Sequence, residues 1–182
     1  MPKDMATLET IEPRTGKPRL RKPEVEDGAQ IWELVRSCRP LDENSMYCNL
    51  IQADHFRDTC VVAELDGEIL GWISGHMIPN ADTFFVWQVA VSPKARGLGL
   101  GRRMLANLIA RDECSGVSAL QTTITKDNDA SWALFNSFAR NIGGDLTDEP
   151  YFHRDAHFDG QHDTEHMVTI ALPDEAILAH AA

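Results

Sequence analysis

The spacing of apolar residues in the first half of the chain predicts one helix and three long strands. A helix is expected between Pro23 and Pro40, because its apolar residues fall on one face. Those residues are Ile31, Leu34, Val35 and Cys38. Apolar runs at 61–65 and 68–74 flank Asp66-Gly67, a pair typical of a tight hairpin turn. The run 83–91 predicts a further buried strand.

The second half predicts two helices and two strands. A helix follows residue 101 and extends to about residue 114. Alternation of apolar and polar residues predicts a half-buried strand around 120–125. Apolar residues at every fourth position predict a helix that Asp127 or Asn128 caps and Gly143-Gly144 ends. The acidic segment 145–163 is expected to be a loop before a final strand at 165–172.

The ends of the chain differ from its middle. Residues 1–18 are polar, contain three prolines and show no periodicity, so a mobile tail is expected. A short strand at 19–22 begins the folded part, and a helical or irregular stretch covers 44–56. The expected organisation is one domain over 19–172, followed by a C-terminal tail at 173–182.

Composition narrows the classes of function. The 182 residues carry a formal net charge of -11, which disfavours nucleic acid as the main partner and suits a cationic small molecule. The four cysteines form no Cys-x-x-Cys pair, which indicates reduced thiols. Neither a membrane-spanning run nor a signal-peptide core is apparent, so we expect a cytoplasmic protein without membrane partners.

A glycine-rich segment between the strand at 83–91 and the next helix is the strongest chemical signal. It reads Arg96-Gly97-Leu98-Gly99-Leu100-Gly101 and follows Ser92-Pro93. Free N–H groups and the dipole of a helix N-terminus can hold a pyrophosphate there. A dinucleotide fingerprint would need glycine in place of Arg102, and a nucleotide P-loop would need Gly-Lys-Ser/Thr. The alternative interpretation of this segment is an ordinary glycine-rich connection between a strand and a helix, with no ligand.

Arg-x-x-Gly-x-Gly after a strand resembles the acetyl-CoA loop of the GCN5-related N-acetyltransferases, the GNAT family. The predicted order of elements matches that family too. The resemblance implies an α/β (α+β) fold in which helices flank a central mixed, mostly antiparallel sheet, splayed at the acetyl-CoA-binding strand. It also implies acetyl-CoA as cosubstrate, with no metal.

The resemblance assigns cofactor-binding residues to the strand and the loop. The Val89 N–H would face the thioester oxygen and stabilise charge that develops on it, a catalytic role. The Val91 backbone would pair with the pantetheine amide, with Ala90 between them. The pyrophosphate cradle would comprise Arg96, Gly97, Leu98, Gly99, Leu100, Gly101 and Arg102.

Asn128 to Phe135 resembles the second family motif, Asn-x-x-Ala/Ser-x-x-Leu-Tyr. Asn128 would bond the pantetheine arm, Ser131 would lie near the pyrophosphate, and Phe135 would pack beside the thiol. Many relatives have tyrosine at the last position, where its hydroxyl protonates the leaving thiolate, and phenylalanine cannot donate a proton. Either another group donates it, or coenzyme A leaves as the thiolate. The alternative interpretation is simply an N-capped amphipathic helix.

Residues 19–172 also resemble a narrower family, the acetyltransferases of ectoine synthesis that act on the γ-amine of L-2,4-diaminobutyrate to give the N4-acetyl product. The segments that carry this resemblance are 41–48, 58–64 and 85–91, with a looser match at 162–166. It implies a homodimer in which the C-terminal region completes the partner's sheet or site.

Diaminobutyrate has two ammonium groups and one carboxylate, so its site needs more acid than base. Asp42 and Glu165 are the candidates for the two ammonium groups, and Trp87 could lay its ring against one of them. Tyr47 and His162 could add hydrogen bonds, and Glu165, His162 or a water held by them could be the base that deprotonates the amine.

Each candidate has a structural alternative. Asp42 could cap a helix, Trp87 could belong to the core, and most of the acidic C-terminal segment could be a solvated face. The pairs His153/His157 and His162/His166 have a spacing that can bind zinc on a helix, but this segment does not have a helical pattern.

Two further classes of function remain open at this point. The chain could acetylate another cationic amine, such as a polyamine or a protein N-terminus, or it could be a non-catalytic acyl-CoA sensor.

Overall fold

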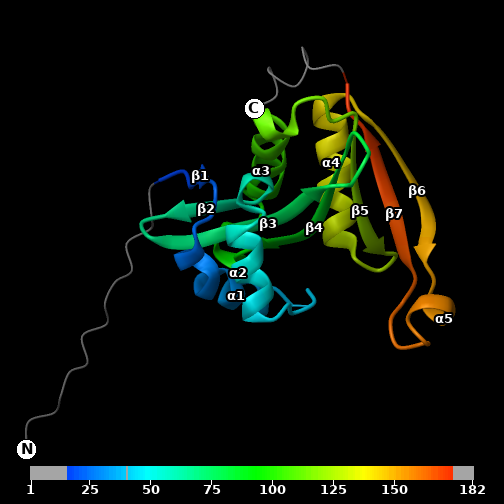
Figure 1. The fold of residues 1–182 in the computed structure, drawn as a ribbon, viewed down its shortest axis with the longest axis horizontal. Helices are drawn as coiled ribbons and strands as arrows, with labels where there is room; N and C mark the ends of the chain where they lie inside the picture. The colour runs from blue at the N-terminus through cyan, green and yellow to red at the C-terminus, as the bar shows by residue number, and fades with distance from the viewer. Residues whose placement is uncertain (1–15, 40, 174–182) are drawn as a thin grey trace, which may run out of the picture.

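The computed structural model describes residues 16–39 and 41–173. Within them, seven strands form one sheet in the order β1-β2-β3-β4-β5-β7-β6, with helices against both faces (Figure 1). Only the β4–β5 pair is parallel, and the other pairs are antiparallel. The expected mixed, mostly antiparallel sheet is confirmed. The expected tails at 1–18 and 173–182 lie almost wholly outside the described residues.

The N-terminal half of the sheet follows the predicted strands. β1 (Arg19–Arg21), β2 (Val61–Leu65), β3 (Glu68–Met77) and β4 (Thr83–Val91) form an antiparallel meander. Asp66 and Gly67 both have positive φ, at 52° and 78°, as a two-residue hairpin turn of this twist requires.

Four helices divide between the two faces of the sheet. α1 (Gly28–Ser37) and α2 (Met46–Asp54) cover one face of β2–β4. α3 (Leu100–Ile109) and α4 (Asp129–Ile142) cover the other face, where they form the larger core with β5 (Ala119–Thr125) and β7 (Glu165–Ala171). The helix expected to reach residue 114 ends at Ile109, and a separate 3-10 turn, η4, covers Asp112–Cys114.

β4 and β5 separate after a short parallel contact. Their register runs only from Thr83 opposite Ala119 to Phe85 opposite Gln121. Beyond that point β4 continues beside β3, and β5 continues beside β7. The sheet is therefore splayed along the second half of β4, as expected, and this opening is called the wedge below.

A β-bulge in β4 changes which side chains face each layer. Gln88 lies opposite Ser74 and Val86 lies opposite Gly75, so Trp87 is the extra residue. Before the bulge, Phe84 and Val86 enter the α3/α4 core, whereas after it Ala90 enters the α1/α2 core. The bulge therefore turns Val89 and Val91 toward the same layer as Phe84 and Val86.

The segment 145–163, expected to be a loop, contains a strand and a short helix. β6 (Asp145–Phe152) pairs with β7 at the edge of the sheet, and α5 (Arg154–His157) follows it (Figure 1). Nearly every β6 side chain is exposed, so the sequence has no apolar alternation there. The loop prediction was wrong because the pairing of this edge strand depends on backbone bonds to β7.

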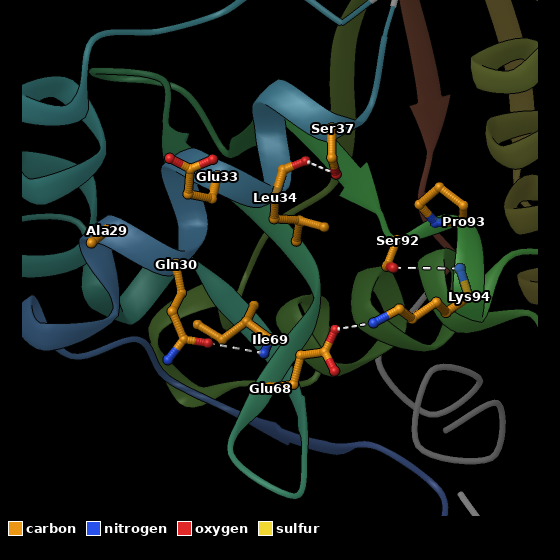
Figure 2. Close-up of a pocket in the computed structure, with 10 residues that line it drawn as sticks. All are labelled: Ala29, Gln30, Glu33, Leu34, Ser37, Glu68, Ile69, Ser92, Pro93 and Lys94. Carbon is orange, nitrogen blue, oxygen red and sulfur yellow. Dashed lines mark hydrogen bonds and ion pairs between the residues drawn. The ribbon is translucent and has the colours of Figure 1, made fainter. Parts of the chain in front are cut away.

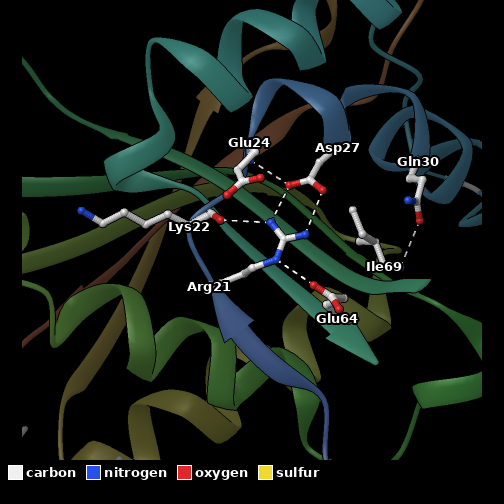
Figure 3. A network of polar contacts seen from close by, with 7 residues as sticks. All are labelled: Arg21, Lys22, Glu24, Asp27, Gln30, Glu64 and Ile69. Atoms are coloured by element: carbon white, nitrogen blue, oxygen red, sulfur yellow. Dashed lines mark hydrogen bonds and ion pairs between the residues drawn. The ribbon is translucent and has the colours of Figure 1, made fainter. Parts of the chain in front are cut away.

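A partly buried ionic cluster fixes α1 against the first strands (Figure 3). The Arg21 guanidinium donates to both carboxylate oxygens of Asp27, at 2.6 and 2.9 Å, and to Glu64 at 2.8 Å. Asp27 also accepts the Glu24 N–H and so caps the 3-10 turn η1 (Val25–Asp27) that leads into α1. This arrangement connects β1, β2 and the start of α1.

Candidate active site

A cavity of about 950 Å³ lies between the wedge and the N-termini of α3 and α4. Most of the residues predicted to bind the cofactor line it. They are Val89, Val91, Arg96, Gly97, Leu98, Gly99, Leu100, Gly101, Arg102, Asn128 and Ser131. The structure thus brings together two motifs that are about thirty residues apart in the sequence.

The glycine loop has the backbone geometry of an anion-binding turn. Gly97 and Gly99 have φ of 77° and 69°, a region that side chains disfavour, and Gly99 is the N-cap of α3. The first N–H groups of α3 have no carbonyl partner within the helix, and they lie at the cavity together with the positive end of its dipole. A pyrophosphate fits this chemistry without a metal ion.

Backbone groups of β4 point into the wedge. The Ser92 N–H donates to the Leu70 carbonyl on β3, at 2.9 Å. Because successive residues of a strand direct their N–H and C=O groups to opposite sides, those of Val91 and Val89 point away from β3. The Val91 carbonyl accepts from the Cys38 thiol at 3.4 Å and from Arg96 Nε at 3.3 Å on that side.

α4 contributes Ser131 to the cavity but keeps Phe135 away from it. The Asn128 side chain caps the helix by accepting the Ser131 N–H at 3.1 Å. Phe135 is 2% exposed within the α3/α4 core and is absent from the cavity wall. Ala90 is also away from the cavity, because its side chain packs against α1.

Three of the predicted substrate residues come together across the wedge. His162 Nε2 lies 3.8 Å from Asp42 Oδ2 and 3.8 Å from Glu165 Oε1. Asp42 lies between α1 and α2, and its carbonyl is held by Gln88 of β4. Glu165 begins β7, opposite Thr125 of β5. This acidic cluster, Asp42, His162 and Glu165, therefore joins the two sides of the splayed sheet.

The two carboxylates of the cluster have different environments. The Glu165 side chain is only 17% exposed, and its Oε2 is buried with no hydrogen-bond partner among the described residues. Burial raises the pKa of Glu165, and the negative charge of Asp42 adds to that rise, whereas His162 and a hydrogen bond from Thr123 oppose part of it. The Asp42 side chain is 89% exposed. A largely buried carboxylate with a raised pKa suits proton transfer, and an exposed carboxylate suits charge pairing.

Trp87 and Tyr47 lie on the surface. Trp87, the bulged residue of β4, is 52% exposed, so its alternative as a core residue is excluded. Its ring lies edge-on to His76, with centroids 6.5 Å apart. Tyr47, in the first turn of α2, is 72% exposed, and no hydrogen bond within the described part of the chain joins it to the acidic cluster.

Sequence reasoning missed several residues of the site. Cys38, Leu41 and Ser137 line the cavity, and Gln88 bonds the segment that carries Asp42. Cys38 and Leu41 flank the end of α1, far in sequence from the glycine loop. The missed signal for Gln88 was a polar residue inside the otherwise apolar run 84–91, since a buried amide needs partners.

A second hollow of about 560 Å³ lies between α1 and the start of β3 (Figure 2). Its polar groups are already paired: Gln30 accepts the Ile69 N–H, and Lys94 bonds Glu68 at 2.8 Å. The hollow contains none of the predicted site residues.

Over the described residues, no group of three or more His, Cys, Asp or Glu side chains is arranged to hold a metal ion. No helix in that part of the chain has the length and apolarity needed to cross a membrane.

Comparison with known proteins agrees with this geometry. The model of the acetyltransferase (GNAT) family matches residues 28–139, a span that includes the glycine loop and most of α4. The chain therefore belongs to the GNAT acetyltransferase family. Solved structures with low identity share this fold, among them Ard1 from Thermoplasma volcanium, with a TM-score of 0.68, 14% identity, and coverage of 87% of this chain and all of that one.

Within that family, the chain is similar to L-2,4-diaminobutyric acid acetyltransferases. It is 45% identical to the enzyme of Methylotuvimicrobium alcaliphilum over 88% of this chain and 93% of that one. It is 49% identical to that of Halomonas elongata over 83% and 79%. The diaminobutyrate acetyltransferase of Paenibacillus lautus, solved with L-2,4-diaminobutyric acid and coenzyme A, has a TM-score of 0.81 and 38% identity, covering 86% and 96%.

Proposed function

We propose that this chain transfers acetyl from acetyl-CoA to the γ-amine of L-2,4-diaminobutyrate, giving N4-acetyl-L-2,4-diaminobutyrate for ectoine synthesis. The observation that carries the proposal is the acidic cluster across the wedge, next to a cavity lined by the acetyl-CoA motifs. Its acids suit a substrate with two ammonium groups, and relatives at 45% and 49% identity are acetyltransferases for this substrate.

The cofactor would lie with its pyrophosphate on the loop 96–102 and its pantetheine along β4. The Val89 N–H would then donate to the thioester oxygen as negative charge develops there. This placement is supported by the direction of the β4 backbone groups and by the free N–H groups at the start of α3.

Glu165 is the proposed base and Asp42 the proposed partner of the other ammonium group. Because the pKa of Glu165 is raised, its carboxylate is a stronger base than an ordinary glutamate and is better able to accept a proton from the substrate ammonium group. The deprotonated amine attacks the acetyl carbon, the nitrogen then gives its remaining extra proton to water, and the thioester C–S bond breaks. Because Phe135 can supply no proton, coenzyme A leaves as the thiolate or takes its proton from another group. His162 lies between the two carboxylates, and Trp87 and Tyr47 complete the proposed substrate residues.

An amine panel tests the function. Thiol release from acetyl-CoA is measured with L-2,4-diaminobutyrate, L-ornithine, putrescine and a peptide N-terminus, and NMR locates the acetyl group on the product. We expect the highest kcat/KM with diaminobutyrate, acetylated at N4. A higher kcat/KM with putrescine or the peptide would show that diaminobutyrate is not the preferred substrate. Acetyl-CoA binding without amine-dependent thiol release would indicate a sensor.

A homodimer and a cytoplasmic location complete the proposal. The edge strand β6 and its exposed Tyr151 and Phe152 support a surface for a second copy near the C-terminal region. All four cysteines are free, which supports a reducing compartment. Light scattering after size-exclusion chromatography tests the dimer, and fractionation of the producing cell tests the location.

A further inference from the structure

Gln88 connects the catalytic strand to the segment that carries Asp42. Its side-chain Nε2 donates to the Asp42 carbonyl at 2.8 Å, and its Oε1 accepts from Asn44 Nδ2 at 3.3 Å. One amide thus holds two residues of the segment between α1 and α2. Gln88 itself is 5% exposed and belongs to β4, so the anchor is buried in a regular strand.

The bulge in β4 gives Gln88 this direction. Trp87 is the extra residue, so the strand after it presents Gln88 and Ala90 to the α1/α2 layer and Val89 to the wedge. The adjacent residues Gln88 and Val89 therefore act in different places. Gln88 holds the segment with Asp42, and Val89 presents its N–H where the thioester is proposed to lie.

The Asp42 carboxylate has little else to define its position. Its side chain is 89% exposed, and its recorded partner is His162 Nε2 at 3.8 Å, beyond hydrogen-bond distance. An exposed side chain with so few contacts takes its position from its backbone. The Asp42 carbonyl is held by Gln88, while the neighbouring Leu41 N–H donates to the Cys38 carbonyl at 3.0 Å. Gln88 is thus the contact that ties this segment directly to β4, and the distance between Asp42 and the thioester position depends on it.

From this geometry we infer that Gln88 is a positioning residue that fixes Asp42 for the amine substrate. The inference rests on the proposed function insofar as Asp42 pairs with an ammonium group. A purely structural role for Gln88 is the alternative, because buried amides that lose their partners also cost folding free energy.

Kinetics of Gln88→Met separate the two roles. Methionine has similar volume and neither donates nor accepts a strong hydrogen bond, so the segment is released without a large cavity. We expect the KM for diaminobutyrate to rise about fivefold, as for the loss of one neutral hydrogen bond, while the KM for acetyl-CoA stays within twofold. Asn44→Ala, which removes the weaker contact from the other side, should raise the same KM by less.

Ser74→Ala is the matched control. Ser74 is buried on β3 directly opposite Gln88, and its hydroxyl has no hydrogen-bond partner among the described residues. A general disturbance of this part of the sheet would affect both variants. We expect Ser74→Ala to retain wild-type KM for both substrates.

A double-mutant cycle with Asp42→Asn tests whether Gln88 acts through Asp42. If it does, Gln88→Met should add no further rise in the KM for diaminobutyrate when Asp42 is already replaced. Additive rises would overturn the inference, as would a Gln88→Met enzyme that folds and keeps the wild-type KM for diaminobutyrate.

Hydrogen exchange of the free protein separates this inference from the proposed function. Gln88→Met should speed amide exchange in residues 41–46 and not in α4, whatever the substrate. Unchanged exchange would overturn the anchoring itself. If Gln88→Met exchanged faster but the wild-type protein did not acetylate diaminobutyrate, the proposed substrate would be wrong and the anchoring role of Gln88 would still hold.

Discussion

The carboxyl group of Glu165 is subject to two opposing influences. Burial against β5 and β7 raises its pKa, while His162, 3.8 Å away, lowers it in part. Asp42, on the opposite side of the same histidine, is exposed to water. Two chemically similar acids in such different surroundings are suited to different tasks.

Substitution should therefore separate the two acids kinetically. Asp42→Asn and Glu165→Gln should each lower kcat/KM for diaminobutyrate about 10- to 100-fold, because each loses a charge-assisted hydrogen bond, and both should spare acetyl-CoA binding. Glu165→Gln should also lower kcat more than Asp42→Asn does. Wild-type kinetics in both variants would contradict the assignment of the substrate site.

The pH profile adds a second measurement on Glu165. A base must be ionised to accept a proton, so kcat/KM should fall as the pH falls through the pKa of Glu165. Because that pKa is raised, the fall should occur at a higher pH than for an ordinary glutamate. The acidic limb should persist in Asp42→Asn, moved to lower pH because the charge of Asp42 helps to raise that pKa, and it should be lost from the residual activity of Glu165→Gln. An unchanged limb in Glu165→Gln would assign the base to another group.

Phe135 lies in the hydrophobic core, so its substitution should mainly reduce the stability of the fold. Phe135→Ala should lower the free energy of unfolding by about 3–5 kcal/mol, measured by urea denaturation, because it leaves a cavity between α4 and the sheet. Phe138→Ala, on the same helix and fully buried, is the control and should lose a similar amount. Weaker acetyl-CoA binding in folded Phe135→Ala alone would place Phe135 beside the thiol after all.

At the scale of elements, the loop before α3 depends on two glycines in the left-handed region. Gly101 is a poor site for testing phosphate binding, because an added Cβ would lie 3.1 Å from Leu134 and disturb the packing of α3 on α4. Nothing lies within 4 Å of a Cβ built at Gly97. A side chain there would extend from the loop without a clash.

Gly97→Glu should therefore weaken acetyl-CoA binding about 10-fold or more by calorimetry, because it puts a negative charge beside the pyrophosphate. Gly97→Ala should show only the effect of the strained φ. Gly116→Glu is the matched control, since Gly116 also has positive φ, at 82°, and open space around it. If Gly97→Glu and Gly116→Glu bound acetyl-CoA with equal affinity, the proposal that this loop binds the pyrophosphate would be wrong.

At the scale of the whole molecule, the position of α1 relative to the sheet determines where the segment with Asp42 begins. The cluster of Arg21, Asp27 and Glu64 fixes that position (Figure 3). Burial alone would raise the pKa of Asp27, but the bonds from Arg21 and from the Glu24 N–H lower it below the ordinary value. The stabilisation it supplies is present above that ordinary value and is lost as the pH falls through the lowered pKa.

Asp27→Asn should accordingly reduce the free energy of unfolding by about 2–3 kcal/mol at pH 7, because the Arg21 guanidinium loses its charged acceptor. In urea titrations from pH 7 to pH 3, its difference from wild type should shrink only at the acidic end. Asp58→Asn breaks the exposed pair with Lys22 and should reduce the free energy of unfolding much less, because water screens that pair. Equal losses in the two variants would show that the Arg21 cluster does not clamp the fold.

Local patterns in the sequence were enough for most elements and for the cofactor motifs. β4 was predicted with its observed bounds because the nine-residue run 83–91 is mostly apolar, with Gln88 as its one internal polar residue, and packs between two helical layers. The cap of α4 was predicted as Asp127 or Asn128 and its end at Gly143-Gly144, because capping uses residues adjacent in the chain; Asn128 and Gly143 are the caps in the structure. The glycine loop followed likewise from backbone conformations that few residues other than glycine adopt. The substrate acids came from family resemblance and from the charge of the proposed substrate.

Tertiary structure alone decided the features that depend on contacts between distant segments. β6 pairs with β7 through backbone hydrogen bonds, and nearly all of its side chains are exposed. Its sequence therefore has no alternation of apolar and polar residues that would predict a strand. Phe135 matched a motif, yet the rotation of α4 on the sheet directs it into the core. The bulge at Trp87 depends on the register against β3, and it directs Gln88 to Asp42, 46 residues earlier in the chain. Local periodicity carries no information about such register, so only the folded chain shows which residues meet at the wedge.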